Sequence, residues 1–530
     1  MHRSFSAKNK PAMDNNPVTF HCNKERRLAK RTRASAKESY DTLIKKAKMA
    51  SAKPHPLEEL QAISQQIGHD LDTVEFARHM DSIDPLRYLR QEFCYPKMKT
   101  LGSVDQTLVD PDEDCVYFCG NSLGICPKKT REYLNIEVDK WEKTALEGHT
   151  NGDLPWAWCD EGLDDKMATI VGAKPGEVSI MNGLTVNLHL LLISFYRPTP
   201  ARFKILMEGH AFPSDHYAVE SQIKLKGYNP DTAMILMEPR EGEHILRKED
   251  ILKVIEEQGN SIALVCLSGV QYYTGQKFDM QTITQAAQEK GCVVGWDLAH
   301  AVGNVEIKLH DWNVDFACWC TYKYLNCGAG CLAGLYIHER HYNNDYPRLT
   351  GWWGHQLSTR FEMDNKFSPY PGAKGYRLSN TPGFLCPPIK ASLEIFEKTS
   401  IKELTEKCRL LTGYLEARII RQYGYPDTNT SVKNGTDVGN GDSNDGPAKH
   451  VYVEILTPSD LSQRGAQLSL SFSVNITQVF KELMKRGVVC DERKPKVIRI
   501  APAPLYCSFE DVHRFMRYLD EALHAAHALE

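Results

Sequence analysis

The chain has 530 residues, of which 42% are hydrophobic and 25% charged, and its formal net charge is -4. This length exceeds one ordinary hydrophobic core, so two domains with appendages are expected. The balanced charge argues against a nucleic-acid or membrane-surface protein, and no apolar stretch reaches the roughly 18–20 residues that span a bilayer. The first residues lack the apolar core of a secretory signal. We therefore expect a cytoplasmic protein whose 16 cysteines are reduced thiols.

The first 48 residues differ from the rest, because they hold 13 Lys and Arg against 4 Asp and Glu. Few large apolar residues interrupt this segment, so residues 1–55 are interpreted as a basic, disordered extension. A targeting arm and a nucleic-acid-binding arm remain alternatives.

Helical periodicity begins at Leu57 and recurs from Val74 to Met80. A short β-like run, Val116–Phe118, precedes the turn Gly120–Gly124, and an amphipathic segment then continues to about Leu146. We expect residues 56–119 to form the N-terminal part of a small domain.

Short β-branched runs then alternate with helical segments such as Lys248–Gln258 and Met280–Lys290. This alternation predicts an α/β layer with a mainly parallel sheet, within a large domain over residues 120–384. The predicted strands are Val178–Met181, Phe203–Met207, Ala233–Met237, Ile262–Leu267, Cys292–Trp296, Phe316–Cys320 and Leu332–Ile337.

Residues 385–530 follow a different pattern, which predicts a smaller α+β domain. One long helix is expected over Ile389–Tyr423, before a polar stretch at residues 425–449 that is typical of a flexible loop. The remaining predicted elements are strands at Val451–Leu456, Gln467–Phe472 and Val497–Ala501, and helices at Thr477–Arg486 and from Phe509.

Polar residues follow the predicted strands, where parallel sheets bind their ligands. Asp297 and Lys323 come after successive strands and are 26 residues apart, and Ser268 follows an earlier strand. Taken singly, such an aspartate is usually a cap and such a lysine is usually solvated. Together they suggest pyridoxal phosphate (PLP), which needs a carboxylate against its ring nitrogen and a lysine that forms a Schiff base.

PLP also needs a phosphate site and a flat group over its ring. The turn Asn182–Thr185 opens a helical run, whose free backbone N–H groups suit a phosphate. Phe212 supplies an aromatic ring and Asp215 a second carboxylate, and His300 is placed to reach the ring hydroxyl.

Four cysteines near Lys323 raise the question of a zinc site: Cys318, Cys320, Cys327 and Cys331. Two of them fall within an apolar run, and none forms a C-x-x-C pair. They are interpreted as small buried thiols, and no metal site is predicted.

Several strings are similar to the kynureninase family of fold-type I PLP enzymes. They are LTVNLHLL (184–191), FPSDHY (212–217), WDLAHAVGN (296–304), DFACWCTYKYLN (315–326), GWWGHQLSTRF (351–361), GNSLG (120–124) and IRIAPAPLY (498–506). The resemblance covers roughly residues 56–525, and it leaves out the basic extension and most of the 425–449 loop.

The resemblance implies how PLP would be held. Lys323 would carry it, Asp297 would face the ring nitrogen, and Asp215 and His300 would hold the ring's polar edge. Phe212 would stack on the ring, with Pro213 and Ser214 beside it. The phosphate side would be held by Leu184, Thr185, Ser268 and Tyr322. Trp352 and Asn380 would reach the site from a neighbouring subunit, which implies a homodimer with shared active sites.

The implied reaction is hydrolysis of L-kynurenine or 3-hydroxy-L-kynurenine to L-alanine and anthranilate or 3-hydroxyanthranilate, in tryptophan catabolism on the route to NAD. Lys323 would be the base and Tyr273 the proton donor, and Arg499 would grip the substrate's α-carboxylate. Ser122, His149 and Asn380 would line the pocket for the aromatic ring, which favours the hydroxylated substrate.

Two other functions are alternatives to kynurenine hydrolysis. A cysteine desulfurase or selenocysteine lyase shares the fold but needs a cysteine on a mobile loop, and none of the 16 cysteines stands in an obviously equivalent loop. A non-catalytic scaffold that engages RNA through the basic tail would have little reason to retain Lys323, Asp297 and Arg499 together.

Overall fold

The computed structural model describes residues 55–424 and 451–528. The predicted polar loop at residues 425–449 and all of the predicted basic extension except residue 55 therefore lie outside the described residues. None of the helices in these two ranges is long and apolar enough to cross a membrane.

The larger unit is built on a seven-stranded sheet with strand order β2-β8-β7-β6-β5-β3-β4. Strands β4, β3, β5, β6 and β7 run parallel, while β8 is antiparallel to both β7 and β2. The strands are β2 (Val178–Met181), β3 (Lys204–Glu208), β4 (Met234–Met237), β5 (Ile262–Ser268), β6 (Val293–Asp297), β7 (Phe316–Trp319) and β8 (Ala333–Ile337). The mainly parallel sheet predicted from the alternating pattern is confirmed.

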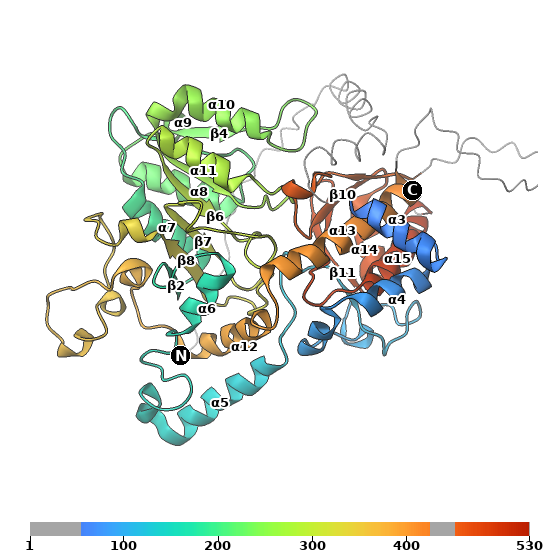
Figure 1. Ribbon diagram of the computed structural model, residues 1–530, viewed down its shortest axis with the longest axis horizontal. Helices are drawn as coiled ribbons and strands as arrows, with labels where there is room; N and C mark the ends of the chain where they lie inside the picture. The colour runs from blue at the N-terminus through green and yellow to red at the C-terminus, as the bar shows by residue number, and fades with distance from the viewer. Residues whose placement is uncertain (1–54, 425–450, 529–530) are drawn as a thin grey trace, which may run out of the picture.

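Helices cover the sheet (Figure 1). They are α6 (Leu163–Ile170), α7 (Leu184–Phe195), α8 (Pro213–Leu225), α9 (Pro230–Ala233), α10 (Lys248–Gln258) and α11 (Met280–Glu289). Because both faces are covered, the central strands are buried throughout, which explains their continuous apolar runs. Two helices at the lower edge of Figure 1, α5 (Lys129–Thr144) and α12 (Cys386–Phe396), are joined by an ion pair between Lys129 and Glu394.

The smaller unit combines both ends of the described chain, as the colours of Figure 1 show. Its antiparallel sheet has the order β12-β13-β10-β9, and a parallel pair joins β1 to β11. These strands are β1 (Val116–Tyr117), β9 (Val453–Ile455), β10 (Leu468–Phe472), β11 (Val488–Val489), β12 (Asp491–Arg493) and β13 (Val497–Ile500). The helices are α3 (Pro56–Ile67), α4 (Val74–Ile83), α13 (Ile401–Tyr423), α14 (Ile476–Lys485) and α15 (Phe509–His527).

The predicted helix over Ile389–Tyr423 is wrong as a single element. The structure has α12, which ends at Phe396, and α13, which begins at Ile401. Ser400 begins a new helix because it caps α13: its side chain accepts from the Glu403 N–H, and the Glu403 side chain accepts from the Ser400 N–H.

Short 3-10 helices connect these elements. They are η1 (Arg87–Glu92), η2 (Met98–Thr100), η3 (Ala145–His149), η4 (Gly259–Ser261), η5 (Glu339–His341), η6 (Trp352–Gly354), η7 (Arg360–Glu362), η8 (Gly372–Tyr376), η9 (Gly383–Leu385) and η10 (Leu461–Gln463). Two of them, η3 and η6, carry the predicted site residues His149 and Trp352.

Candidate active site

A pocket of about 220 Å³ opens beyond the carboxyl ends of β3, β5, β6 and β7. Most of the predicted site residues line it, although they come from segments far apart in the sequence. The lining comprises Asn121, Ser122, Leu184, Thr185, Phe212, Ser214, Asp215, Ser268, Val270, Tyr272, Asp297, Ala299, His300, Tyr322, Lys323, Arg493 and Arg499.

Lys323 is one of the lining residues and lies four residues after the end of β7. Its Nζ is 2.8 Å from Nε2 of His300. Burial and the neighbouring Lys323 charge hold the pKa of His300 well below its usual value, so the imidazole is neutral and Nε2 accepts from the amine. The proton then sits on Nδ1, which is buried and has no hydrogen-bond partner in the described chain.

Two carboxylates lie together beside the lysine. Burial and the adjacent Asp297 carboxylate raise the pKa of Asp215 well above its usual value. Asp297 also accepts from the Ala299 N–H at 2.7 Å, whereas Oδ1 of Asp215 is buried without a partner. Because like charges this close cannot both ionise readily, the pair retains a proton until a cation is placed against it.

Two helix N-termini converge on another side of the pocket. Helix α7 begins at Leu184 and α8 at Pro213, and the hydroxyls of Thr185 and Ser214 are 2.7 Å apart. Asn182 adopts a left-handed φ of 50°, which turns the chain sharply from β2 into α7. Two sets of free N–H groups together with two hydroxyls make a site suited to a phosphate.

Phe212 precedes α8 and remains 46% exposed, with its ring edge-on to Tyr272 at 5.3 Å between centroids. An aromatic ring held at a pocket wall with one face open can stack on a flat ligand.

Glu208 is a buried carboxylate near this site that the sequence analysis missed. It ends β3, and Oε1 accepts from the Ser268 N–H at 2.8 Å and from the Ser268 hydroxyl. Burial raises the pKa of Glu208 to about 7. No sequence signal distinguishes it, since a charged residue at the end of a strand is normally solvated.

Arg499 reaches the pocket from β13 of the smaller unit. Its Nη1 donates to the Tyr272 carbonyl oxygen at 2.8 Å and its Nη2 pairs with Asp491 at 2.5 Å, while its buried Nε has no partner among the described residues. Asp491 also holds Arg493 at 3.1 Å, so the pocket has a second guanidinium that the sequence analysis did not predict.

Five predicted residues do not line the pocket of the single chain: Tyr273, His149, Trp352, Asn380 and Pro213. Instead, Tyr272 and Tyr322 supply the pocket's tyrosine side chains. The Tyr273 ring packs edge-on against Tyr272, with 6.2 Å between the ring centroids, and its role as the proton donor stays a prediction. Pro213 contributes as the first residue of α8 rather than as a lining side chain.

The other three lie elsewhere on the larger unit. The His149 ring packs edge-on against Trp156 at 5.5 Å between centroids. Trp352 is 46% exposed and Asn380 is exposed.

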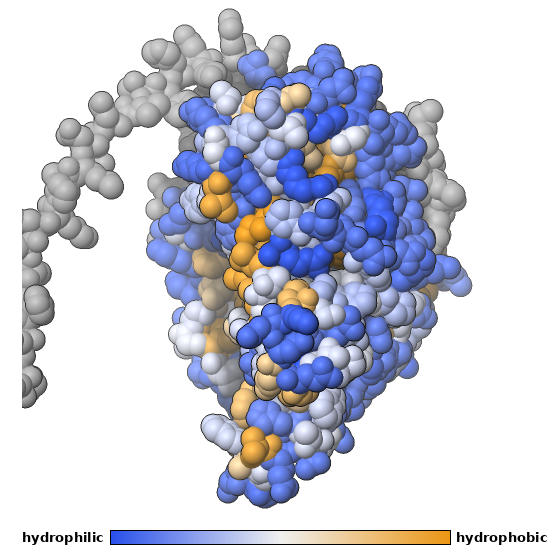
Figure 2. Space-filling view, turned by 90° about the vertical axis from the view of Figure 1, so that its left-hand side faces the viewer, coloured by the Kyte–Doolittle hydropathy of each residue, from blue (hydrophilic) through white to orange (hydrophobic). Residues whose placement is uncertain are grey.

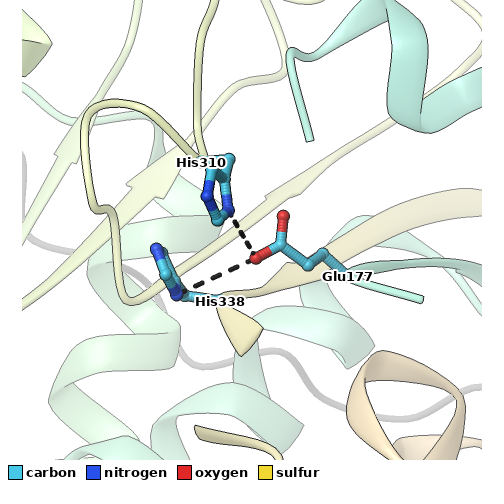
Figure 3. A group of neighbouring side chains, drawn as sticks. All are labelled: Glu177, His310 and His338. Carbon is cyan, nitrogen blue, oxygen red and sulfur yellow. Dashed lines mark hydrogen bonds and ion pairs between the residues drawn. The ribbon is translucent and has the colours of Figure 1, made fainter. Parts of the chain in front are cut away.

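Glu177, His310 and His338 form a separate group with metal-ligand side chains (Figure 3). Their atoms already have partners. Glu177 accepts from Nδ1 of His310 at 3.0 Å and from two backbone N–H groups, and Nδ1 of His338 accepts from the Arg340 N–H at 3.1 Å. We interpret the group as a structural contact that joins the start of β2 to the end of β8. The four cysteines considered for zinc are buried free thiols.

The residues present fit PLP. Asp215 and His300 each leave a buried polar atom without a partner in the pocket, and the carboxylate pair favours a cationic ring nitrogen. The paired helix N-termini suit the phosphate, and the Lys323 amine lies among these groups.

Comparison with known proteins agrees with this geometry. A family model described as aminotransferase class-V matches residues 162–425, and one described as kynureninase C-terminal domain matches residues 446–519. The kynureninase of Nematostella vectensis is 54% identical over 88% of this chain and 97% of its own length. The human kynureninase is 51% identical over 89% of this chain and 97% of its own length.

Solved structures show the same fold at low identity. A cysteine desulfurase from Escherichia coli has a TM-score of 0.61 and 14% identity, covering 83% of this chain and 99% of its own. A C-DES mutant with glycine covalently linked to its PLP cofactor has a TM-score of 0.60 and 15% identity, covering 78% and 99%. At such identities these neighbours show the fold alone, and they give no support to the desulfurase alternative.

The sheet and the pocket at its carboxyl edge therefore define a PLP enzyme of the class-V aminotransferase fold. Half or more of the aligned residues are identical to those of kynureninases along nearly their whole length. The chain belongs to the kynureninase family.

Proposed function

We propose that the pocket around Lys323 carries out the family's reaction, the PLP-dependent hydrolysis of L-kynurenine and 3-hydroxy-L-kynurenine to L-alanine and anthranilate or 3-hydroxyanthranilate. The observation that carries the assignment is that Lys323, the Asp215–Asp297 pair and Arg499 all line one pocket. These groups can hold the cofactor and an amino-acid carboxylate at the same time.

When bound, PLP withdraws electrons from the amino acid, which allows Cα to lose a proton and the Cβ–Cγ bond to break. The residues that would hold it are Lys323 through a covalent link, Asp297 and Asp215 at the ring's polar edge, and Phe212 against its face. Leu184, Thr185, Ser214 and Ser268 would hold the phosphate, and His300 would bind the ring's hydroxyl side.

Lys323 would also move the proton from the substrate. Its Nζ donates one hydrogen to Nε2 of His300, which fixes the direction of the amine. With that hydrogen committed, the lone pair of the free amine is available to accept the Cα proton. A neutral His300 suits this task because it accepts a hydrogen bond without adding positive charge beside the amine.

Arg499 would bind the α-carboxylate of the substrate. Its Nε has no partner in the described chain, and its other nitrogens are fixed by Tyr272 and Asp491, so the guanidinium is oriented before the substrate arrives. Fixing the guanidinium in advance lowers the entropy lost when the carboxylate binds.

A proton donor is needed at Cβ after the carbon–carbon bond breaks. Tyr322 lines the pocket, and burial raises the pKa of its hydroxyl, so it stays protonated at neutral pH and can donate. Tyr272 also lines the pocket. We therefore propose Tyr322 as the donor, with Tyr272 as the second candidate, in place of Tyr273.

A homodimer with shared sites is supported by what the single chain leaves exposed. Helix α5 carries the apolar residues Ile136, Val138 and Trp141 exposed by 44, 49 and 61%, and Leu146 beyond it is exposed by 78%. Figure 2 shows further apolar side chains in a broken band down the face on the left of Figure 1. Exposed apolar surface on this scale is typical of an interface.

A partner subunit would then complete the aromatic end of the pocket with His149, Trp352 and Asn380. Ser122 already lines the pocket in the single chain. An asparagine amide near the substrate ring can hydrogen-bond a 3-hydroxyl group, so 3-hydroxykynurenine is the proposed preferred substrate and the cytoplasm the proposed location.

Turnover of both kynurenines by the purified PLP-loaded protein tests the assignment directly. The products can be followed by the fluorescence of anthranilate and 3-hydroxyanthranilate, and alanine can be measured separately. Release of alanine and the matching aromatic acid in equal amounts is expected. Absence of both products from a protein that binds PLP would reject the proposal.

A further inference from the structure

Two cysteines on the surface stand apart from the others. Of the fifteen cysteines within the described ranges, Cys94 and Cys126 are exposed and the remaining thirteen are buried. Neither of the two lines the PLP pocket.

The two cysteines lie directly opposite each other on antiparallel segments. Phe93 and Pro127 form an antiparallel bridge, and the Cys94 N–H donates to the Cys126 carbonyl oxygen at 2.9 Å. The Lys128 N–H donates to the Glu92 carbonyl oxygen at 2.8 Å, which keeps the same register. Opposed residues that are hydrogen-bonded in this way have Cα atoms about 5.5 Å apart, the commonest separation for a disulfide.

The Cys126 side chain has a local partner, because its thiol donates to the Pro127 carbonyl oxygen at 3.4 Å. Burial and the neighbouring Cys94 thiol raise the pKa of the Cys126 thiol. A thiol with a raised pKa forms less thiolate at neutral pH, so we assign the first attack on peroxide to Cys94.

The pair lies where the chain passes from the smaller to the larger unit. Phe93 packs edge-on against Tyr506 of the smaller unit at 5.2 Å between centroids, while Cys126 comes just before α5 of the larger unit. Lys129 forms an ion pair with Glu394 of α12, and Glu92 forms one with Lys398, two residues beyond the end of that helix.

The crossing segment also reaches the active site. Ser122 lines the pocket, and the Gly124 N–H donates to the Tyr322 carbonyl oxygen at 2.8 Å. A Cβ on Gly124 would come within 2.4 Å of the Lys323 carbonyl oxygen, so this segment is packed directly against the lysine's backbone. Cys126 is two residues from Gly124, so a bond that restrains Cys126 acts close to the contact between Gly124 and the Lys323 backbone.

We propose that Cys94 and Cys126 form a surface dithiol that peroxides oxidise reversibly to an intramolecular disulfide, and that this disulfide slows the neighbouring active site. The Cys94 thiolate attacks one peroxide oxygen and becomes a sulfenic acid while the other oxygen leaves as water or an alcohol. The Cys126 thiolate then attacks the sulfenic sulfur, which releases water and forms the S–S bond. Two electrons pass from the two thiols to the peroxide, and an added dithiol returns them.

The test uses the holoenzyme treated with hydrogen peroxide and digested without reduction. The expected product is one cross-linked peptide pair joining Cys94 to Cys126, two hydrogen atoms lighter than the reduced peptides, which disappears after dithiothreitol. Oxidation confined to other cysteines, or Cys94 and Cys126 joined only between different molecules, would overturn the proposal.

Single-cysteine variants provide matched controls. Cys126→Ser should leave Cys94 as a sulfenic acid that dimedone labels, while Cys94→Ser should leave Cys126 unlabelled under the same treatment. Equal dimedone labelling in both variants would contradict the assigned order of reaction.

Turnover measured on the same samples tests the link to the active site. Kynurenine turnover of the wild-type holoenzyme should fall as the cross-link forms and recover with dithiothreitol, whereas the Cys94→Ser/Cys126→Ser variant should keep its activity in peroxide. Unchanged turnover at complete cross-linking would reject the link, and the peptide result does not depend on which substrate the enzyme uses.

Discussion

Nζ of Lys323 and Nε2 of His300 are 2.8 Å apart, so the amine donates a hydrogen bond to a neutral imidazole. This contact connects residues on two successive strand ends and fixes the direction of the amine. The first prediction therefore concerns Lys323 as the attachment point of the cofactor and as the base.

Lys323→Ala should abolish turnover, with a loss of at least about 10³-fold, because both the covalent attachment point and the base are removed. Borohydride treatment of the wild-type holoenzyme should attach the cofactor permanently to the peptide that contains Lys323. Lys277→Ala is a suitable control, since this lysine lies in the loop after β5 and does not line the pocket. Label on any other lysine would remove Lys323 from its assigned role.

Arg499→Ala should raise KM for kynurenine far more than it lowers PLP affinity, because it removes a carboxylate-binding group rather than a cofactor ligand. Because the charge-assisted pair between Arg499 and the substrate carboxylate is lost, kcat/KM should fall on the order of 10²-fold. Arg493→Ala, at the other partner of Asp491, should have a smaller effect. Steady-state kinetics and PLP titration of the same samples separate the two contributions, and a normal KM would rule out Arg499 as the carboxylate ligand.

Tyr322→Phe should reduce kcat, on the order of 10²-fold, because the hydroxyl that stays protonated would be lost from the pocket. Tyr273→Phe is the matched comparison, since its side chain does not line the pocket. Retained turnover in Tyr322→Phe with loss in Tyr273→Phe would restore Tyr273 as the donor and reject the revised assignment.

Glu208→Gln should flatten the pH dependence of stability. The pKa of Glu208 is about 7 in the folded chain against an ordinary 4.5, so the folded state keeps a proton that the unfolded state releases. Stability from this group is therefore full below pH 4.5 and falls as the pH rises toward 7, by on the order of 3 kcal/mol.

Urea unfolding of the cofactor-free protein at several pH values measures this effect. Asp81 and Asp164 also have raised pKa values of about 6 and contribute with the same sign, so the difference between wild type and variant is the relevant quantity. An identical slope in the two proteins would contradict the assignment to Glu208.

Mixed dimers test the shared active site. Lys323→Ala and Asn380→Ala proteins should each be nearly inactive alone. If Asn380 acts across the interface, subunit exchange should restore roughly a quarter of the wild-type activity, because half of the dimers then contain one intact site. No recovery after confirmed exchange would place Asn380 in the same site as its own Lys323.

The sequence by itself predicted the larger sheet and that Asp297 and Lys323 follow two of its strands. Alternating apolar runs and helical periods indicated parallel strands, and Asp297 and Lys323 follow two of them that the structure places side by side. Local patterns predict these features well, because a strand's burial and a helix's start depend mostly on nearby residues. The break at Ser400 was missed because apolar periodicity continues across it and only the cap interrupts the helix.

Only the tertiary structure decided which side chains from distant segments meet. Sequence patterns do not distinguish Tyr272 from its neighbour Tyr273, yet of these two only Tyr272 lines the pocket. Its carbonyl oxygen also accepts a hydrogen bond from Arg499. Glu208 ends an ordinary strand, but packing buries it against Ser268 and changes its pKa. Cys94 and Cys126 are 32 residues apart, and they become neighbours through the register of two short segments. Sequence patterns report how a side chain relates to its own element, whereas these contacts depend on how the elements pack together.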